Sequence, residues 1–487
     1  DSIVETNELL NVVLSGLSAT GRDVTVTDSS GAITIDNNDS SELSVALTTA
    51  PGTLTEDSGS VTFTISMSNP VAVPVTTLYG AENPLMPGSY DDFAGGAGSV
   101  TWDKYTNSDQ TFTLDVVDDS VVELDETFSV QLFGLDAGTI AEFDNDLVTI
   151  GTSSDTFTVI DNDTASISIN DISVTENHHG HSFATLTATL NTAVDVPVTV
   201  DVDTADSTAT AADNGLSGDE DYVAVDSSIT FAGTAGETQT VTVQINGDNV
   251  VEATEQLLVD LSSIAASGRE ADISFSDSQG VITIENDDSA TVSIVETSTG
   301  DEDSGNRTLA VTLSNPVDIN VGVDVDTADG TATTADSDYD ALDASLTFSN
   351  VSGAPLSQTV EVVVNADDTV ELDEALTAVL SSLSATDRDV TLGNATSTVT
   401  LSNDESASVS IDDVTVNEDD GTATLTITLS HDVDVDVSVD ADTADSTATS
   451  AAQGALASDY VAVGQTSTFA AGSGANATQA VVVSIND

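Results

Sequence analysis

Most side chains of this sequence that could do chemistry are carboxylates, and they gather where predicted strands end. Between residues 288 and 404 they fall into three separate segments: Asp326, Asp329, Asp336 and Asp338; Asp367, Asp368, Glu371, Asp373 and Glu374; and Asp404. Ca2+ takes about six to eight oxygen ligands, typically from several loops. Clustered carboxylates raise one another's pKa unless a cation lies between them. The segments therefore suggest a calcium site, and the alternative is a solvated acidic rim.

The overall charge excludes several classes of partner. The chain has 487 residues with 85 Asp and Glu against 5 Lys and Arg, a formal net charge of −80. So few bases cannot neutralise phosphates, which excludes nucleic acid and anionic membrane surfaces. The chain has no cysteine, which excludes disulfides and thiolate zinc sites, and no apolar run long enough for membrane insertion. This composition is typical of an extracellular or high-salt setting.

The elements that must position the acids are β-strands. Val61, Phe63, Ile65 and Met67 alternate with Ser and Thr, and the same period of two recurs along the chain. This period indicates strands with one buried face and one solvated face. Clusters of Gly, Asp, Asn and Ser separate about seven such runs per 120 residues, which predicts an all-β fold of seven-stranded antiparallel, immunoglobulin-like sandwiches.

Three landmarks repeat about every 120 residues, a spacing that indicates one domain per repeat. One landmark is an acidic stop after a strand, as in IDNND, IDND, IENDD and LSND; the others are DVDTADSTAT and DDSVVELDETF with their relatives. They predict complete units at 40–163, 164–287 and 288–404. Residues 1–39 match the last third of a unit, and residues 405–487 match the first two thirds.

The two partial segments fit each other. Placing Asp487 before Asp1 gives VSIND-DSIVETNELL, which matches LDVVD-DSVVELDETF with no residue missing or duplicated. One interpretation is an arbitrary window from a longer array. The other is that residues 405–487 are completed by residues 1–39 of the next copy, either a separate chain or the next stretch of one array. The absence of a signal-like segment at Asp1 predicts a mature product or a fragment.

The order TEDSG, strand, TADGTA, SDY, strand, DD-x-VVE-x-DE, strand, NDD resembles the Calx-beta domain, and the resemblance covers essentially the whole chain. That family includes regulatory domains of sodium–calcium exchangers, an integrin cytoplasmic module and long bacterial surface proteins. The resemblance implies a sandwich that binds Ca2+ at one end. The ligands would come from the TADGT loop, the DD-x-x-x-E loop and the terminal acidic run.

Carried over by position, the resemblance implies metal ligands at Asp1, Glu5, Asp39, Asp118, Asp119, Glu123, Asp161, Asp163, Asp206, Asp248, Glu252, Asp287, Asp288, Asp329, Asp367, Glu371, Asp404, Asp445 and Asp487. Some units depart from the family pattern. The unit 40–163 has Asn83 in place of the TADGT acid, so its calcium loop is predicted to be degenerate. The unit 164–287 has NGD in place of DD, and the strand-A acid of exchanger domains has no clear match in any unit.

Other candidate chemistry is sparse. His178, His179 and His181 form an HHGH turn that could bind a transition metal, but a solvated turn is favoured because no other unit has histidine there. Arg22, Arg269 and Arg388 recur at one repeat position, which predicts an ion pair within the unit. No catalytic constellation is recognisable, so the chain is predicted not to be an enzyme.

These observations predict a calcium-loaded extracellular structural protein. It would be a rigid linear rod that serves as a surface adhesin stalk or as a head-to-tail filament. Its predicted partners are neighbouring copies of itself and surface receptors or glycans. The alternative is a calcium-sensing regulatory module that controls a partner protein.

Overall fold

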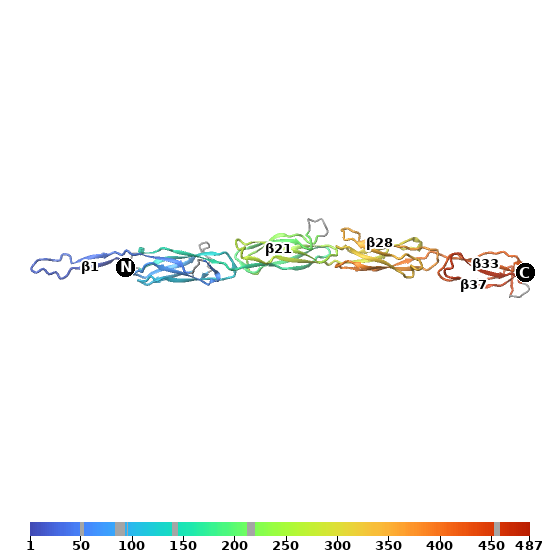
Figure 1. Ribbon diagram of the computed structural model, residues 1–487, viewed down its shortest axis with the longest axis horizontal. Helices are drawn as coiled ribbons and strands as arrows, with labels where there is room; N and C mark the ends of the chain where they lie inside the picture. The colour runs from blue at the N-terminus through green and yellow to red at the C-terminus, as the bar shows by residue number, and fades with distance from the viewer. Residues whose placement is uncertain (49–52, 83–92, 95, 139–144, 212–219, 452–457) are drawn as a thin grey trace.

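The computed structural model shows a row of β-sandwiches arranged end to end (Figure 1). It describes residues 1–48, 53–82, 93–94, 96–138, 145–211, 220–451 and 458–487. Strands and short 3-10 turns are the regular elements of these residues, with no α-helix among them. The predicted all-β fold and its arrangement as a linear rod are confirmed.

In the first complete unit, two five-stranded sheets enclose a core. The strand Ser60–Met67 shows how the sequence builds it, because Val61, Phe63, Ile65 and Met67 are buried while the Thr and Ser between them are not. The orders are β4-β13-β11-β6-β8 and β12-β3-β5-β9-β7, with β3 Ser41–Leu47, β4 Thr53–Thr55, β5 Ser60–Met67, β6 Val75–Glu82, β7 Phe93–Ala94, β8 Ala97–Trp102, β9 Gln110–Val116, β11 Glu126–Asp136, β12 Val148–Ile150 and β13 Ser154–Ile160.

The second and third units repeat this plan. In the second, the sheets are β20-β16-β14-β22 and β15-β23-β21-β18-β19, with β14 Ala165–Ile169, β15 Ile172–Thr175, β16 Gly180–Leu190, β18 Val198–Asp206, β19 Asp226–Phe231, β20 Glu237–Gly247, β21 Glu255–Ala265, β22 Ile273–Asp277 and β23 Gln279–Glu285. In the third they are β28-β25-β24-β30 and β27-β26-β29-β31, with β24 Ala290–Glu296, β25 Arg307–Leu313, β26 Val321–Ala328, β27 Asp343–Phe348, β28 Ser357–Val362, β29 Glu374–Ser384, β30 Val390–Leu392 and β31 Thr396–Leu401.

Each complete unit has seven strand positions. At the last position the chain forms two short strands, one in each sheet: β12 and β13, β22 and β23, and β30 and β31. In the first and second units the first position also forms two strands, β3 and β4 or β14 and β15, and each pairs with one strand of the last position. These pairs, such as β14 with β22 and β15 with β23, are parallel, while the others within a unit are antiparallel. Parallel pairing of the first and last strands along the chain follows from an odd number of strand positions that alternate in direction. A period-two pattern shows which face a strand buries but not which strand it pairs with, so this detail was not predicted.

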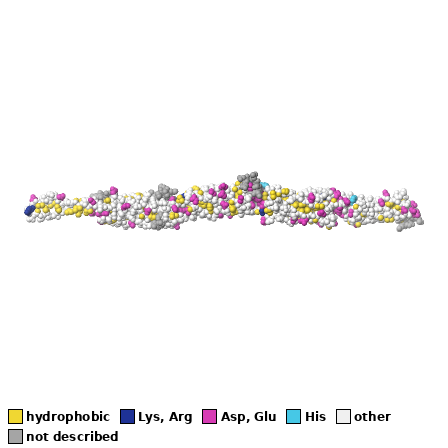
Figure 2. Space-filling view, turned by 45° about the horizontal axis from the view of Figure 1, so that its top comes forward, with side chains coloured by type: hydrophobic (Ala, Val, Ile, Leu, Met, Phe, Trp, Pro, Cys, Tyr) yellow, Lys and Arg dark blue, Asp and Glu magenta, His cyan; other side chains and the backbone are white. Residues whose placement is uncertain are grey.

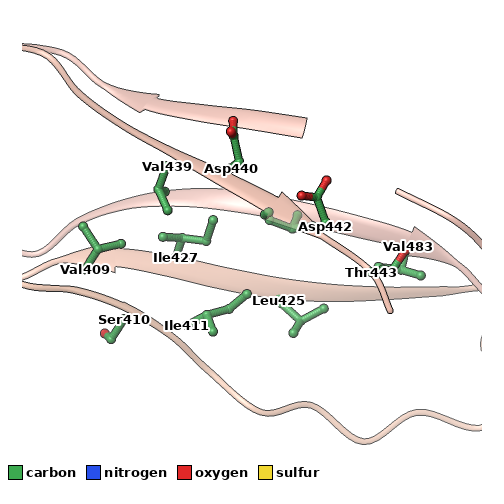
Figure 3. Close-up of a pocket in the computed structure, with 12 residues that line it drawn as sticks. Val409, Ser410, Ile411, Leu425, Ile427, Val439, Asp440, Asp442, Thr443 and Val483 are labelled. Carbon is green, nitrogen blue, oxygen red and sulfur yellow. The ribbon is translucent and has the colours of Figure 1, made fainter. Parts of the chain in front are cut away.

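The partial segments lie at opposite ends of the rod (Figure 1). Residues 1–39 form a lone hairpin of β1 (Glu8–Val13) and β2 (Ser30–Ile35) that projects beyond the first unit. Residues 405–487 form a half-sandwich in which an apolar groove lies open between the two sheets (Figure 3). Its strands are β32 Val409–Ile411, β33 Thr422–Leu429, β34 Val437–Asp442, β35 Ser450–Ala451, β36 Tyr460–Val461, β37 Gly464–Phe469 and β38 Ala477–Ser484.

The hairpin and each complete unit contribute one valine that pairs with the unit that follows. Val4 bridges Val71, Val251 bridges Val317 and Val370 bridges Val433, while β10 (Val121–Val122) pairs with β17 (Ala193–Val194). At the junction of the second and third units, Val251 N–H donates to Pro316 O (2.9 Å), and Asp318 N–H donates to Val251 O (3.2 Å). Val4, Val122 and Val251 are fully buried in the core of the next unit. The junctions are therefore packed contacts that repeat along the rod.

Candidate metal centres at the domain junctions

The acids converge at the end of each complete unit, beside the valine that enters the next one. In each group the potential ligand atoms lie within 4.8 Å of one another. The groups are Glu56, Asp161 and Asp163; Glu176, Asp248 and Asp288; Glu302, Asp404 and Glu405; and Asp338, Glu371 and Glu374. Acidic side chains are scattered along the rod surface, as Figure 2 shows, but these groups are partly withdrawn from solvent.

The group of the second unit is the most buried. Glu176 is only 5% exposed and Asp288 only 4%, and one carboxylate oxygen of each has no hydrogen-bond donor among the described residues. Burial, followed by the charges of Asp248 and Asp288, raises the pKa of Glu176 from 4.5 to about 8. Burial, followed by the charge of Asp221, raises the pKa of Glu252 to about 9. Buried carboxylates with these pKa values lack a compensating positive charge.

Gly247 explains the departure of this unit from the DD motif. The Cβ of any other residue there would come within 2.0 Å of Asn177 O and 2.6 Å of Glu176 O. A side chain cannot be accommodated against backbone atoms at those distances, so the glycine lets the loop with Asp248 approach the loop with Glu176. The second unit therefore has glycine where the DD motif has its first aspartate, and this glycine allows Asp248 and Glu176 to lie close together.

In the third unit, two acid groups surround one small cavity. Its volume is about 10 Å3, close to the space of one water-sized sphere, and its lining includes Glu302, Asp338, Glu371 and Glu374. Burial, followed by a hydrogen bond with Glu405, raises the pKa of Glu302 to about 8. Burial, followed by a hydrogen bond with Asp338, raises the pKa of Glu374 to about 7.

The following unit also contributes charge to this site. Burial and then Asp367 and Asp338 raise the pKa of Glu371, and the next contribution comes from Asp434. Asp434 lies next to Val433, the residue that Val370 bridges. The acids of one unit therefore act on the acids of the next across the junction.

The donor sets fit a hard cation. Most of the potential ligand atoms are carboxylate oxygens. Among the described residues, one oxygen each of Asp163, Glu176 and Asp288 is buried without a hydrogen-bond donor. Ca2+ prefers such oxygen ligands from converging loops. A bound ion would supply positive charge beside these carboxylates and would lower their pKa values. Asn403 orders the third site, because its Oδ1 accepts the N–H of Glu371 (2.9 Å).

The structure brings together seven of the residues predicted from the sequence: Asp161, Asp163, Asp248, Asp287, Asp288, Glu371 and Asp404. Four others border these groups. Glu123 N–H donates to Asp161 (3.0 Å), while Asp118 and Asp119 help to raise the pKa of Asp163 after burial and Asp161. Asp367 acts on Glu371 in the same way.

The TADGT acids have a structural partner instead. Asp206, Asp329 and Asp445 each accept a hydrogen bond from a tyrosine hydroxyl, at 2.6, 2.6 and 2.7 Å. The pKa of Asp329 and that of Asp445 are lowered first by this bond. None of the three belongs to an acid group among the described residues, so their role as ligands stays a prediction. Asn83, the substitution in the first unit, lies outside the described residues.

The remaining predicted residues are divided between the ends of the rod. Asp1, Glu5 and Asp39 accompany the hairpin, and Asp487 ends the half-sandwich. Asn37 contacts both Glu5 and Asp39, whereas Asp487 lies at the opposite end of the rod from these residues.

The sequence analysis missed the acid that precedes the second strand of each unit. Glu56, Glu176 and Glu302 each occupy an acid group, and Glu418 stands at the same repeat position. The signal was present, because TEDSG, TENHHG, DEDSG and NEDDG share one glutamate. Asp338 and Glu374 were among the clustered acids that suggested a calcium site but were not carried over as ligands, and Glu405 was not predicted.

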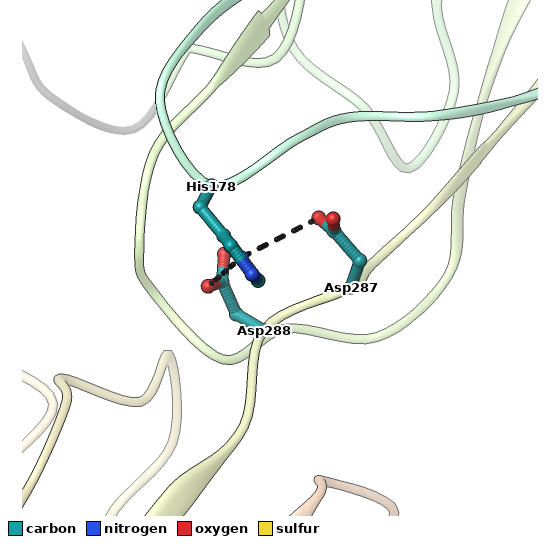
Figure 4. A group of neighbouring side chains, drawn as sticks. All are labelled: His178, Asp287 and Asp288. Atoms are coloured by element: carbon teal, nitrogen blue, oxygen red, sulfur yellow. Dashed lines mark hydrogen bonds and ion pairs between the residues drawn. The ribbon is translucent and has the colours of Figure 1, made fainter.

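His178 joins the second acid group instead of forming a histidine site. Its Nδ1 lies 2.7 Å from Asp288 Oδ1 and 3.9 Å from Asp287 Oδ1 (Figure 4). Among the described residues, neither His179 nor His181 belongs to a group of potential ligands. A cation at this group would therefore share Asp288 with His178.

The predicted ion pairs within units are confirmed for two arginines. Arg269 pairs with Asp195, and Arg388 Nη2 lies 2.5 Å from Asp318 Oδ2. Asp195 and Asp318 each follow the residue bridged by the preceding unit. The hydrogen bond to Asp318 is the main cause that raises the pKa of Arg388, and Glu252 of the preceding unit adds to it. These arginines therefore lie beside the junctions.

The sequence model of the Calx-beta domain matches residues 36–163, 160–288, 285–406 and 402–487. The chain belongs to the Calx-beta family. Calx-beta domains are calcium-binding modules without catalytic function, and this chain carries them in tandem. A comparison with curated proteins finds no match.

Solved Calx-beta structures resemble the chain. The crystal structure of CBD12 from CALX1.2 is 14% identical, covers 50% of this chain and 99% of its own, and has a TM-score of 0.21. The apo-form Calx CBD1 domain is 21% identical, covers 26% of this chain and 100% of its own, with a TM-score of 0.21. Within its described residues, this chain has no helix that is long and apolar enough to span a membrane.

The third Calx-beta unit offers a direct test of its acid groups. We expect Glu371→Gln to weaken calcium binding roughly ten- to hundredfold, because Glu371 lines the cavity between the groups. Glu361→Gln is the matched control, because Glu361 is exposed on β28. Calcium titration of the full chain by calorimetry measures both. Equal losses from the two substitutions would indicate a diffuse acidic surface.

Proposed function

We propose that this chain is an extracellular structural protein, a rod of Calx-beta sandwiches that Ca2+ stiffens at the junctions, and that it serves as a cell-surface stalk or fibre. The observation that carries the proposal is the position of the acid groups. They lie at the end of each unit, next to the valine that is buried in the following one. An ion there would link loops whose orientation decides the angle between units.

The charge of the chain supports the same proposal. The net charge is −80, and the mutual repulsion of the carboxylates disfavours their close packing. Bound divalent cations would offset this repulsion at the acid groups, where the carboxylates are closest together. The lack of cysteine and the dominance of acids are compatible with an extracellular, calcium-rich setting. Surface receptors or glycans as partners stay a prediction.

A regulatory calcium sensor is the alternative, and the two functions differ in what calcium does to shape. In a structural rod, calcium occupies the junctions and reduces bending. In a sensor, calcium changes the arrangement of the units so that a partner is bound or released.

Small-angle X-ray scattering of the full chain in EDTA and in millimolar Ca2+ separates these functions. We expect an extended particle in both conditions, with a larger maximum dimension and less flexibility in Ca2+. Compaction by Ca2+ would favour the sensor. Identical scattering curves, together with no calcium binding by calorimetry, would overturn the proposed function.

A further inference from the structure

The turn before β16 brings a histidine to the junction between the second and third units. The Nδ1 atom of His178 lies 2.7 Å from Asp288 Oδ1 and 3.9 Å from Asp287 Oδ1 (Figure 4). The two aspartates lie between β23 and β24, in the segment that connects the units. Potential ligand atoms of all three residues lie within 4.8 Å of one another. Side chains from two separate segments of the chain therefore converge at this point.

This group has a type of ligand atom that the acid groups lack. Imidazole nitrogen binds Zn2+ and other divalent transition metals, whereas Ca2+ prefers oxygen. The other groups of potential ligands in the described part of the chain consist of carboxylates alone. Where the second unit has TENHHG, the other complete units have TEDSG and DEDSG, without histidine. The second unit therefore offers nitrogen and oxygen ligands together.

Asp288 has an oxygen available for an ion. The residue is only 4% exposed, and its Oδ2 is buried without a hydrogen-bond partner among the described residues. A buried carboxylate oxygen without a partner is costly, and a bound cation would remove this cost. Asp288 also belongs to the group with Glu176 and Asp248, and the buried Oε1 of Glu176 likewise has no described hydrogen-bond partner. The surroundings of His178 are therefore negative and favour a divalent cation.

A proton on His178 does not account for the whole arrangement. Nδ1 carries one proton at most, and the hydrogen bond of 2.7 Å to Asp288 uses it. Asp287 lies too far away to share this bond. A tetrahedral metal with bonds of about 2.0–2.1 Å holds neighbouring ligand atoms about 3.3 Å apart. The distances of 2.7 and 3.9 Å lie on either side of this value, so small side-chain rotations would let one ion contact all three residues.

The backbone on both sides of the group is held in place. Asn286 Nδ2 donates to Asp288 O (2.9 Å), and Asn286 Oδ1 accepts the N–H of Glu252 (3.2 Å). On the histidine side, Asn177 has a left-handed backbone conformation with φ of 74°. Its carbonyl oxygen lies so close to Gly247 that a Cβ there would come within 2.0 Å of it. Ligands that are fixed by their surroundings in this way lose less freedom when they bind a metal.

We propose that His178, Asp287 and Asp288 form a site for a divalent transition metal of the Zn2+ type, with water as a further ligand. The inference goes beyond the proposed calcium function and does not rest on it, because the imidazole nitrogen is a ligand that Ca2+ does not prefer. A bound metal would attach the turn before β16 to the segment that leads into the third unit. One such ion is expected per chain.

The test is a calorimetric titration of the full chain with Zn2+, in millimolar Ca2+ so that calcium sites are filled first. Wild type should bind one zinc ion. His178→Ala should lower the zinc affinity at least about tenfold, because even outer partners of metal ligands contribute about 10- to 100-fold. The His178 side chain is 63% exposed, so its removal does not disturb folding. His179→Ala is the matched control with less than about a threefold change, because His179 belongs to no described group of potential ligands.

A second metal and a second ligand make the result specific. The visible absorption spectrum of Co2+ should change when the ion binds to wild type or to the His179→Ala chain, and should stay that of the free ion with His178→Ala. Asp287→Asn should weaken zinc binding about tenfold or more. Calcium affinity should change less than about threefold with His178→Ala, because Ca2+ does not prefer nitrogen.

Four results would overturn the inference. They are a wild-type chain that does not bind zinc, zinc binding that His178→Ala leaves unchanged, equal losses from His178→Ala and His179→Ala, and displacement of zinc by millimolar Ca2+. A chain that binds zinc at His178 but binds no calcium would support the inference and overturn the proposed function alone.

Discussion

In EDTA, the complete units should melt about ten degrees or more below their melting temperature in millimolar Ca2+. A site that binds folded protein with free calcium at about a hundred times its dissociation constant contributes about 2.7 kcal/mol. For a unit of this size, each kcal/mol shifts the melting temperature by about 4 °C or more. Calorimetric scans in low salt measure the difference. Equal melting temperatures would show that the buried acids do not hold calcium.

The pH dependence of this effect follows from the raised pKa values. Glu176 has a pKa of about 8 and Glu252 of about 9 in the folded chain, against 4.5 ordinarily, mainly through burial. Between those values the folded calcium-free chain binds more protons than the unfolded chain, so its stability should fall as the pH rises from about 5 to about 9. Calcium displaces the protons, so its affinity should rise over the same window. A calcium-free stability that rises with pH would contradict this assignment.

Glu176→Gln isolates the contribution of one buried acid. The substitution removes the carboxylate that must be protonated or neutralised, so we expect the calcium-free stability of the second unit to become less dependent on pH. Calcium should then stabilise that unit much less. Glu285→Gln is the matched control, because Glu285 is exposed at the end of β23 in the same unit.

Val251→Asp should uncouple the second unit from the third. Val251 is fully buried in the core of the third unit, and a carboxylate there would cost several kcal/mol without a partner. Releasing the loop sacrifices only about 1.5–3 kcal/mol of apolar burial. We therefore expect the loop to leave the core while both units stay folded. Scattering should show a shorter, more flexible rod, with melting temperatures changed by only a few degrees.

Val351→Asp is the control for this substitution. Val351 is 68% exposed on the third unit, so the same chemical change there meets solvent. We expect it to leave both the scattering curve and the melting temperature unchanged. If the Val251→Asp chain were as long and as stiff as wild type in scattering, the contact of Val251 with the third unit would not set the angle between the two units.

The fold could be predicted because each strand carries its own pattern. The alternation at Val61 to Met67 decides which face is buried, and the recurring acidic stops mark where a unit ends. The stretch 371–384 contains helix-forming residues, yet β29 covers Glu374–Ser384, in the place that β11 and β21 take in the other units. Agreement between repeats was a stronger guide than the propensity of one segment.

The site was predicted only in part, because convergence depends on pairing between strands. The loops of Asp248 and Asp288 were recognised by their motifs, whereas Glu176 was missed because its loop precedes a strand and has one short signal. The junction valines were missed for a related reason. The residues in question are Val4, Val122, Val251 and Val370, which stand among acids. Their segments were therefore predicted as ligand loops, and the packing contact that each valine makes with the next unit was not predicted.

The parallel pairing of first and last strands bears on how the rod carries tension. The chain enters the second unit through β14 and β15 and leaves it through β22 and β23, which run beside them in the same direction. A pull on the two ends of the unit therefore slides these strands lengthwise, and the hydrogen bonds between them share the load instead of opening one after another.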